Sequence, residues 1–336
     1  MNTKQIVLAS RPIGMPSVAN LRFEETELES IKAGEVLLRS LFISVDPYMR
    51  GRMNDTRSYA KPYEVNEPIR GGVVARVIES RSPAFKEGDM VVGDYLPWRI
   101  YSVESGEHLR RIDPEIAPPG YNLGILGMPG LTAFVGMNGI GKPKKGETVV
   151  VSGAAGAVGL VAGQIASLQG CKVIGIAGTD EKCTMLKNEF GFRETINYKS
   201  SKNIKKDVRY LCPDGVDVYF DNVGGPVTQG VIDNLNFHSR VVVCGQISQY
   251  NNTRYEMVPD ILPKVLTRSI LIQGFIVRNY SHLYEEGLSY LTEKLKLGQL
   301  RYKETVIQGF DRLPETFLGL FSGINLGKLL VEVESE

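Results

Sequence analysis

The clearest pattern of hydrophobic and polar positions begins near residue 148, where short apolar runs alternate with stretches of helical spacing. The predicted elements are, in chain order, strand 148–152, turn 153–156, helix 157–169 ended by Gly170, strand 172–177, a helix capped by Thr179 or Asp180 that stops at Gly191, strand 194–198, helix 201–211, a strand and glycine turn in 215–225, helix 227–235, strand 239–245 and, after a polar loop and a short helix, strand 269–277. Strands that are apolar on both faces and alternate with helices indicate a parallel sheet covered on both sides. The fold class is therefore α/β, with a doubly wound sheet.

Residues 1 to about 122 show a different pattern. The runs "EVLLRSLFISVDPY", "GGVVARVIES" and "DMVVGDYLPW" are rich in β-formers and are separated by Pro, Gly and charged turns. This pattern is typical of a separate antiparallel β domain. The end of the chain, from about residue 300 to 336, mixes strands with a short helix and is expected to complete that domain. We therefore expect a β domain of residues 1–122 with about 300–336, a nucleotide-binding domain of residues 123–299, and a ligand site in the cleft between them.

The apolar stretch 148–166 also has to be weighed as a membrane segment, because Gly159 and Gly163 have the spacing of closely packed membrane helices. A membrane span needs about 20 apolar residues. Ser152 and Gln164 interrupt this stretch, and every position from 153 to 157 is Gly or Ala. The N-terminus has neither the apolar core nor the cleavage site of a signal peptide. We therefore interpret the stretch as a strand that turns into a helix.

Composition narrows the possible partners and metals. The chain has 39 basic and 38 acidic residues, for a net charge of +1, so no long-range field favours nucleic acid or an anionic membrane. The four cysteines are far apart and are expected to be reduced, cytosolic and mostly buried. A catalytic zinc site needs three N, S or O ligands. The predicted β domain has no Cys and one His, His108, so we expect no metal.

The residues 154–159, Ala-Ala-Gly-Ala-Val-Gly, depart from strict G-x-G-x-x-G, since Ala stands at the first glycine position. The context is nonetheless that of a dinucleotide site, with a strand before, a helix after and a second strand about 15 residues on. Small residues let the backbone approach a pyrophosphate, and Gly163 is expected to pack closely on the sheet. The second strand ends without the carboxylate typical of NAD sites, and Lys182 follows it, which favours NADP. Asp180 weakens this argument unless it faces away.

Two of the 15 tyrosines are candidates for catalysis. Tyr250, in "CGQISQYN", follows the fifth strand of the sheet, at the carboxyl edge where open α/β sheets bind ligands. Tyr48, in "VDPYMRGRM", leaves a strand of the β domain beside Asp46 and Arg50. The alternative for this second segment is a loop with solvated charges, and the sequence does not decide between the two.

These motifs together resemble the zinc-independent medium-chain dehydrogenase/reductases, in particular the leukotriene hydroxydehydrogenase and prostaglandin reductase group, with bacterial curcumin-type and plant double-bond reductases. The similarity spans essentially the whole chain, through "VDPYMRGRM", "LGMPGLTAF", "SGAAGAVG", "GTDEK", "INYK", "DNVGG", "CGQISQYN", "QGFIV" and "GINLGKLLV". It implies a GroES-like domain, a Rossmann domain, NADPH, and metal-free reduction of the carbon–carbon double bond of α,β-unsaturated ketones and aldehydes by hydride transfer to the β-carbon. It also implies a small-molecule substrate and a homodimer.

The resemblance assigns roles by position. Gly156, Ala157, Val158 and Gly159 would hold the pyrophosphate, and Lys182 and Tyr198 the 2′-phosphate. Residues expected to line the adenosine, ribose and nicotinamide are Asn222, Cys244, Gly245, Gln246, Ile247, Ser248, Tyr250, Phe275, Ile276, Val277 and Asn325, with Met128 to Thr132 near the nicotinamide.

One departure affects the catalytic assignment. Several relatives have a tyrosine eight residues before the Phe of "QGF", where this chain has Thr267. Tyr250 is then the better candidate for orienting substrate, and either Tyr250 or water is expected to protonate the α-carbon. Two alternatives stay open, an NADPH-dependent quinone reductase and an NADPH-binding protein without turnover.

Overall fold

The computed structural model describes residues 1–254 and 257–333 and divides into two compact units, residues 1–124 with 304–336 and residues 125–303. The strands are β1 (Asn2–Leu8), β2 (Leu21–Glu27), β3 (Glu35–Ser44), β4 (Arg70–Ser80), β5 (Met90–Pro97), β6 (Tyr101–Ser105), β7 (Arg110–Arg111), β8 (Thr148–Ser152), β9 (Lys172–Ala177), β10 (Glu194–Asn197), β11 (Val216–Asp221), β12 (Leu235–Val243), β13 (Leu271–Gly274), β14 (Glu304–Gln308) and β15 (Lys328–Glu332). The helices are α1 (Tyr48–Arg52), α2 (Met128–Phe134), α3 (Ala157–Leu168), α4 (Asp180–Glu189), α5 (Ile204–Leu211), α6 (Gly225–Ile232), α7 (Leu262–Thr267), α8 (Tyr284–Lys296) and α9 (Leu313–Ser322).

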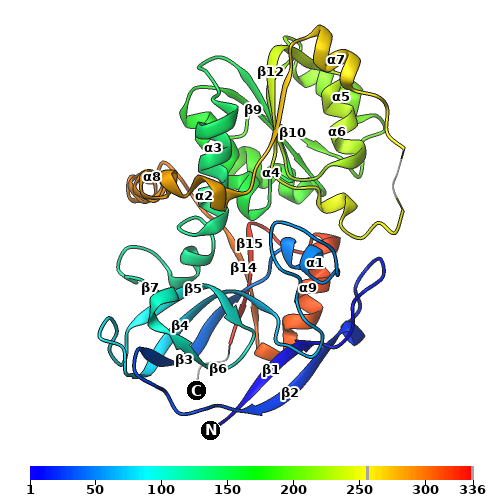
Figure 1. The fold of residues 1–336 in the computed structure, drawn as a ribbon. Coiled ribbons are helices and arrows are strands. Elements are labelled where there is room, and N and C mark those ends of the chain that lie inside the picture. The colour runs from blue at the N-terminus through cyan, green and yellow to red at the C-terminus, as the bar shows by residue number, and fades with distance from the viewer. Residues whose placement is uncertain (255–256, 334–336) are drawn as a thin grey trace. The chain divides into compact units, whose positions relative to one another are not determined.

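The unit of residues 125–303 is built on a six-stranded parallel sheet in the order β10-β9-β8-β11-β12-β13. Numbered from β8, this is the strand order 3-2-1-4-5-6 of the dinucleotide-binding fold. Figure 1 shows α3 on one side of this sheet and α5 and α6 on the other. The predicted doubly wound α/β fold is therefore confirmed.

Small residues allow the helices of this unit to approach the sheet. A Cβ added to Gly163 of α3 would lie 2.0 Å from a ring carbon of Phe192, so only glycine fits there. Gly170 follows the helix with φ +82°, and Gly191 follows α4 with φ +73°, left-handed conformations that glycine adopts without strain. The glycines that the sequence places at the helix ends therefore fix where the chain turns back to the next strand.

The other unit is a β structure. Its seven-stranded sheet runs in the order β14-β15-β3-β4-β5-β7, with β6 paired to β3, and β1 and β2 form a separate antiparallel pair. The last strands of the chain belong to this sheet, because β15 pairs antiparallel with β3. The strand β14 in turn pairs parallel with β15. Residues 304–332 thus return to the unit in which the chain begins.

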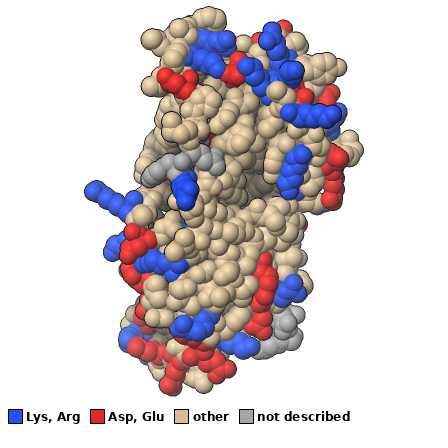
Figure 2. All heavy atoms as spheres, turned by 90° about the vertical axis from the view of Figure 1, so that its right-hand side faces the viewer, with Lys and Arg blue, Asp and Glu red and all other residues tan. Residues whose placement is uncertain are grey.

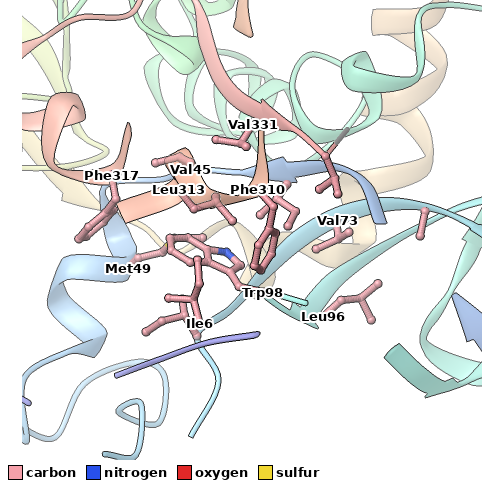
Figure 3. Packing of buried hydrophobic residues seen from close by; sticks show 14 of the residues in the cluster. Ile6, Val45, Met49, Val73, Leu96, Trp98, Phe310, Leu313, Phe317 and Val331 are labelled. Carbon is pink, nitrogen blue, oxygen red and sulfur yellow. The ribbon is translucent and has the colours of Figure 1, made fainter. Parts of the chain in front are cut away.

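The core of this β unit surrounds Trp98, which has no exposed surface. Its ring meets the edge of Phe317 from α9, with ring centroids 6.4 Å apart and an interplanar angle of 73°. Met49 of α1 and Ile6 of β1 pack in the same cluster, as Figure 3 shows. Segments from residues 6–98 and from residues 310–333 therefore share one hydrophobic core.

Four predicted segments differ from the structure. The helix predicted over 227–235 covers Gly225–Ile232. The helix predicted over 201–211 begins at Ile204, because the Asn203 side chain accepts a hydrogen bond from Lys206 N and caps it there. The strand predicted over 239–245 begins four residues earlier, because Leu235 pairs with Val216. The strand predicted over 269–277 covers only 271–274, and residues 275–277 leave the sheet.

Basic and acidic side chains both lie on the surface, as their nearly equal numbers predict. Figure 2 shows groups of Lys and Arg side chains next to Asp and Glu side chains on one face, most of which is formed by other residues. Within residues 1–254 and 257–333, no helix is both long and apolar enough to cross a membrane.

Candidate active site

The turn between β8 and α3 forms an anion-binding arrangement. Gly153 has φ +57°, and its carbonyl oxygen accepts a hydrogen bond from Gly156 N at 3.0 Å. A Cβ added to Gly159 would lie 2.4 Å from that same oxygen, so the first turn of α3 can lie this close only with glycine. Gly156 occupies the N-cap position and provides no side-chain cap. The N-terminus of the twelve-residue α3 helix therefore has no side-chain cap, as in a phosphate site.

The end of β9 contains the residues predicted to select the cofactor. Thr179 is the N-cap of α4 and accepts a hydrogen bond from Lys182 N at 3.2 Å. The Asp180 carboxylate is turned to Asn197, whose Nδ2 donates to it at 2.7 Å. Asp180, which could otherwise have indicated an NAD site, is thus hydrogen-bonded to Asn197.

Lys182 and Tyr198 lie at the same end of the sheet. A Cβ added to Gly178, which follows β9, would lie 3.2 Å from the Tyr198 hydroxyl. Burial lowers the pKa of the Lys182 ammonium, and the nearby positive charge of Lys199 lowers it further. Two ammonium groups at one place favour a dianionic ligand, because such a ligand relieves their mutual repulsion.

The loops that follow β11 and β12 are bound to each other by hydrogen bonds. The Asn222 side chain donates to Ser152 O at 2.7 Å, and the backbone carbonyl oxygen of Asn222 accepts from Ile247 N at 3.3 Å. Ser248 Oγ donates to Val223 O at 2.7 Å. Of the predicted cofactor residues, Asn222 and the segment 244–248 are therefore brought together at the carboxyl edge of the sheet.

Tyr250 follows this segment by two residues. Its hydroxyl oxygen accepts a hydrogen bond from Gln246 N at 3.3 Å. A Cβ added to Gly245 would lie 3.2 Å from the same oxygen, so the ring lies directly against the backbone of the segment. The hydroxyl is thereby held at the edge of the sheet where ligands of this fold bind.

The remaining predicted residues of this unit lie around α2 and the end of β13. Thr132 Oγ1 donates to Met128 O at 2.7 Å, which places the two residues one turn apart on α2. Phe275 meets Tyr280 edge-on, with ring centroids 6.1 Å apart, and a Cβ added to Gly136 would lie 3.1 Å from the Phe275 ring. Ile276 and Val277 follow Phe275 and are half-buried.

Tyr48 and Asn325 belong to the β unit. Tyr48 is the first residue of α1, and burial raises the pKa of its hydroxyl well above the usual value. The alternative of a loop with solvated charges is wrong. The segment is helical, and Asp46 and Arg50 are only 6% and 3% exposed. Asn325 Nδ2 donates to Gly327 O at 2.7 Å in the turn before β15.

The buried charges beside Tyr48 have partners from distant parts of the chain. Lys328 Nζ donates to Asp46 Oδ1 at 2.8 Å and to Val45 O at 3.0 Å, and Ser44 Oγ donates to the other Asp46 oxygen. Arg50 Nη2 donates to Gly14 O at 2.8 Å. These contacts fix the turn from which α1 and Tyr48 begin.

The sequence analysis missed Ser152 and Asp221. Asp221 is the last residue of β11 and is 1% exposed, and Ser152 Oγ donates to its Oδ1 at 2.8 Å. The detectable signal is a carboxylate at the carboxyl end of a buried strand, immediately before the glycine turn of "DNVGG". These two side chains connect the end of β8, after which the predicted phosphate turn begins, to the end of β11.

A cavity of about 450 Å³ in this unit is separate from all of these residues. It is lined by Ser201–Lys205 and by residues of 226–233 and 259–264. None of the predicted site residues borders it, so the candidate site rests on the loops at the carboxyl edge and not on this cavity. Within residues 1–254 and 257–333, no group of three or more His, Cys, Asp or Glu side chains could hold a metal ion.

Comparison with known proteins gives the family. Residues 4–112 match the family described as "N-terminal domain of oxidoreductase", and residues 157–294 match "Zinc-binding dehydrogenase". The chain is 51% identical to the Bacillus subtilis protein YfmJ over 332 residues, which cover 98% of this chain and 97% of YfmJ. It is 41% identical to the NADPH-dependent curcumin reductase of Escherichia coli over 335 residues, 98% of this chain and 96% of that protein. It is 39% identical to the NADP(+)-dependent 2-alkenal reductase of Nicotiana tabacum over 341 residues, 100% and 99% of the two chains.

The solved structure of CurA from Vibrio vulnificus in complex with NADPH superposes on this chain with a TM-score of 0.94 at 41% identity, covering 99% of this chain and 100% of that one. The alignments with these relatives cover 98% or more of the chain and therefore include both units. The chain therefore belongs to the medium-chain dehydrogenase/reductase family, in the group that includes the curcumin, 2-alkenal and prostaglandin reductases.

Proposed function

We propose that this protein is an NADPH-dependent reductase of the carbon–carbon double bond of α,β-unsaturated ketones and aldehydes. The observation that carries the proposal is the Tyr250 hydroxyl, held by Gln246 N at the same sheet edge as the β8–α3 turn. A donor beside a dinucleotide site is what a reaction that builds negative charge on a carbonyl oxygen requires. Full-length similarity to a curcumin reductase and a 2-alkenal reductase supports this choice of substrate class.

The residues present fit NADPH. The uncapped amides at the start of α3 suit a pyrophosphate, and Gly159 leaves room for the backbone to approach it. Lys182 and Tyr198 suit the 2′-phosphate. Asn222 and the segment 244–250 would line the ribose and nicotinamide, together with Phe275–Val277 and Met128–Thr132. The relative solved with NADPH supports this assignment.

In the proposed mechanism, NADPH would supply, when bound, a hydride from C4 of its nicotinamide for a new C–H bond at the β-carbon of the substrate, and would become NADP⁺. The π electrons then move toward the carbonyl oxygen, which gains negative charge. Tyr250 donates a hydrogen bond to this oxygen and so stabilises the developing charge. A proton from water or from Tyr250 adds to the α-carbon and completes the reduction.

The unit of residues 125–303 would hold the cofactor. In the β unit, Tyr48 is the candidate catalytic residue, and the Lys328–Asp46 pair fixes the turn before the α1 helix that Tyr48 begins.

A substrate panel tests the reaction class. NADPH should be oxidised faster with enals and enones than with quinones. Faster oxidation with quinones, or no turnover with any enone, would contradict the proposal.

The four cysteines are predicted to be unreactive toward such electrophilic substrates. Burial raises the pKa of Cys244 and of Cys212 to about 12 and that of Cys171 to about 11, and the Asp221 charge adds to the effect at Cys244. Thiolates, not thiols, attack electrophiles. At pH 8 the native protein should therefore react with Ellman's reagent far more slowly than free cysteine, while the urea-unfolded chain exposes four reactive thiols. Rapid reaction of the native protein would contradict the raised pKa values.

The raised pKa values of these thiols also predict how the free energy of unfolding depends on pH. A thiol whose pKa is higher in the folded chain keeps its proton there, whereas the unfolded chain loses it above the usual value of about 9. The free energy of unfolding should therefore be unaffected by these groups below pH 9 and should fall as the pH rises from about 9 to about 12. Urea denaturation at a series of pH values measures this directly.

We further propose a cytoplasmic location, because four free cysteines favour a reducing compartment.

We also propose a homodimer that forms along β13. The strand β13 ends the six-stranded sheet, and its Leu271 and Ile272 are 50% and 37% exposed. Leu266 of the preceding α7 is 81% exposed. An exposed apolar edge strand is a template for pairing with a second chain.

Leu271→Lys should convert the dimer to a monomer, because a charge on an edge strand opposes strand pairing. Size-exclusion chromatography with light scattering should show a mass near 37.1 kDa for this variant and twice that for the wild type. Leu297→Lys is the matched control, since Leu297 is 60% exposed and follows α8. A wild-type monomer, or equal dissociation in both variants, would overturn the β13 interface.

A further inference from the structure

The Asp221 carboxylate is a buried charge that is satisfied by neutral donors. It is 1% exposed and accepts five hydrogen bonds, three from hydroxyl groups and two from backbone amides. The donors are Ser152 Oγ at 2.8 Å, Tyr219 OH at 2.9 Å, Val223 N at 3.0 Å and Gly224 N at 3.1 Å on Oδ1, and Thr228 Oγ1 at 2.6 Å on Oδ2. A buried carboxylate is tolerated only with such a set of hydrogen bonds, so its donors are held in fixed positions around it.

Two of these donors set the conformation of the turn after β11. The amides of Val223 and Gly224 both point at Asp221 Oδ1, which closes the turn at residues 222–224. Ser152 Oγ, which donates to the same carboxylate, also accepts from Asn222 N at 2.9 Å. The carboxylate thus determines where the carbonyl groups of this turn point.

Those carbonyl groups in turn hold the segment that contains the predicted nicotinamide residues. Asp221 O accepts from Cys244 N at 2.8 Å and from Gly245 N at 3.0 Å. Val223 O accepts from both the backbone amide and the hydroxyl of Ser248, at 3.1 and 2.7 Å. Two amino acids later in this segment the chain reaches Tyr250, whose hydroxyl is bound by Gln246 N.

We propose that Asp221 is a positioning residue, whose carboxylate sets the place of the Tyr250 hydroxyl through the 222–224 turn and the 244–248 segment. The inference rests on the proposed function only for the catalytic role of Tyr250. Its structural content, that removing the charge loosens residues 244–250, stands by itself.

Asp221→Asn is the informative substitution. Asp221→Ala would leave five donors without this acceptor and would threaten folding. In Asp221→Asn the Oδ1 bonds can be kept, and one hydrogen of the new amide can be donated to Thr228 Oγ1, which then donates to Tyr219 OH at the 3.1 Å separation seen between them. The substitution thus keeps an acceptor oxygen for the Oδ1 donors and removes the charge that strengthens their hydrogen bonds.

Asp217→Asn is the matched control on the same strand. Asp217 lies at the other end of β11, where it accepts from Thr148 N at 2.8 Å and from Asn236 Nδ2 at 2.7 Å. Each substitution therefore removes one carboxylate that accepts a hydrogen bond from a residue of β8. Only Asp221 also accepts hydrogen bonds from the 222–224 turn.

The first test is amide hydrogen exchange of the protein without added cofactor, followed by mass spectrometry. Peptides covering residues 244–250 should exchange about tenfold faster in Asp221→Asn than in the wild type and at the wild-type rate in Asp217→Asn. Equal exchange of this segment in the two variants would overturn the proposal.

The second test is a double-mutant cycle with Tyr250→Phe, read as the rate of single-turnover hydride transfer to an enone. Asp221→Asn should slow hydride transfer several-fold in the wild type and less than twofold in the Tyr250→Phe background, where the hydroxyl to be positioned is absent. An equal loss in both backgrounds would show that Asp221 acts independently of Tyr250. A wild type without enone reduction would refute the proposed function, while the exchange experiment would still decide the structural role of Asp221.

Discussion

Replacement of Lys182 by alanine is expected to weaken NADPH binding by about 10- to 150-fold, the equivalent of losing a charge-assisted hydrogen bond of about 1.5–3 kcal/mol. Lys182 lies in the first turn of α4, which follows β9, and burial together with the charge of Lys199 lowers the pKa of its ammonium when no anion is present. A 2′-phosphate would restore a favourable environment for this charge. NADH has no such phosphate, so its affinity should change little.

Fluorescence titration with both cofactors measures the difference. Lys187→Ala is the control, because Lys187 lies on the same helix but pairs with Glu194 at 2.8 Å. It should leave both affinities unchanged. If Lys182→Ala weakened NADPH and NADH binding equally, Lys182 would not be the 2′-phosphate ligand.

Replacement of Tyr250 by phenylalanine is expected to slow hydride transfer by about tenfold or more. Loss of one donor to a developing oxyanion commonly costs about 10²–10³ in turnover, and a cofactor ribose hydroxyl that shares the charge would reduce this loss. The affinity for NADPH should change far less than the rate, because the interaction strengthens only as charge builds on the carbonyl oxygen.

Gln246 N, which loses its acceptor in this variant, belongs to an exposed residue and can bind water instead. Tyr210→Phe is the control for removal of a hydroxyl, since Tyr210 is 83% exposed on α5. Stopped-flow single-turnover rates and NADPH affinities of the two variants separate the effects. Unchanged hydride transfer in Tyr250→Phe would leave Tyr250 as a packing residue.

The parallel sheet was predictable from the sequence because its signals are local. Apolar runs such as 148–152, helical spacing such as 157–168 and the glycines that end helices each lie within a few residues of the element that they define. The β8–α3 turn was predictable for the same reason, since Gly159 and Gly153 are six residues apart. The boundaries of α5 and β12 were less certain, because a capping side chain and a pairing strand decided them.

The features that the sequence did not predict depend on distant partners. The sequence does not decide whether Asp46 and Arg50 in "VDPYMRGRM" are solvated. They are buried because Lys328, 282 residues beyond Asp46, and the 12–14 loop provide their partners. Asp221 was missed because Ser152, 69 residues earlier, supplies one of its donors. Local patterns therefore identify the strands and the turn, whereas buried polar contacts emerge only once the chain is folded.

The most direct test of the central claim is the fate of deuterium from stereospecifically labelled [4-²H]NADPH during reduction of an enone such as trans-3-nonen-2-one. The proposal predicts, with the label on the transferred face, a saturated ketone that contains one deuterium at the carbon β to the carbonyl group, detected by NMR spectroscopy and mass spectrometry. Deuterium at the carbonyl carbon, in an allylic alcohol, would show carbonyl reduction and would contradict the proposed function, as would the absence of any labelled product from either face of the cofactor.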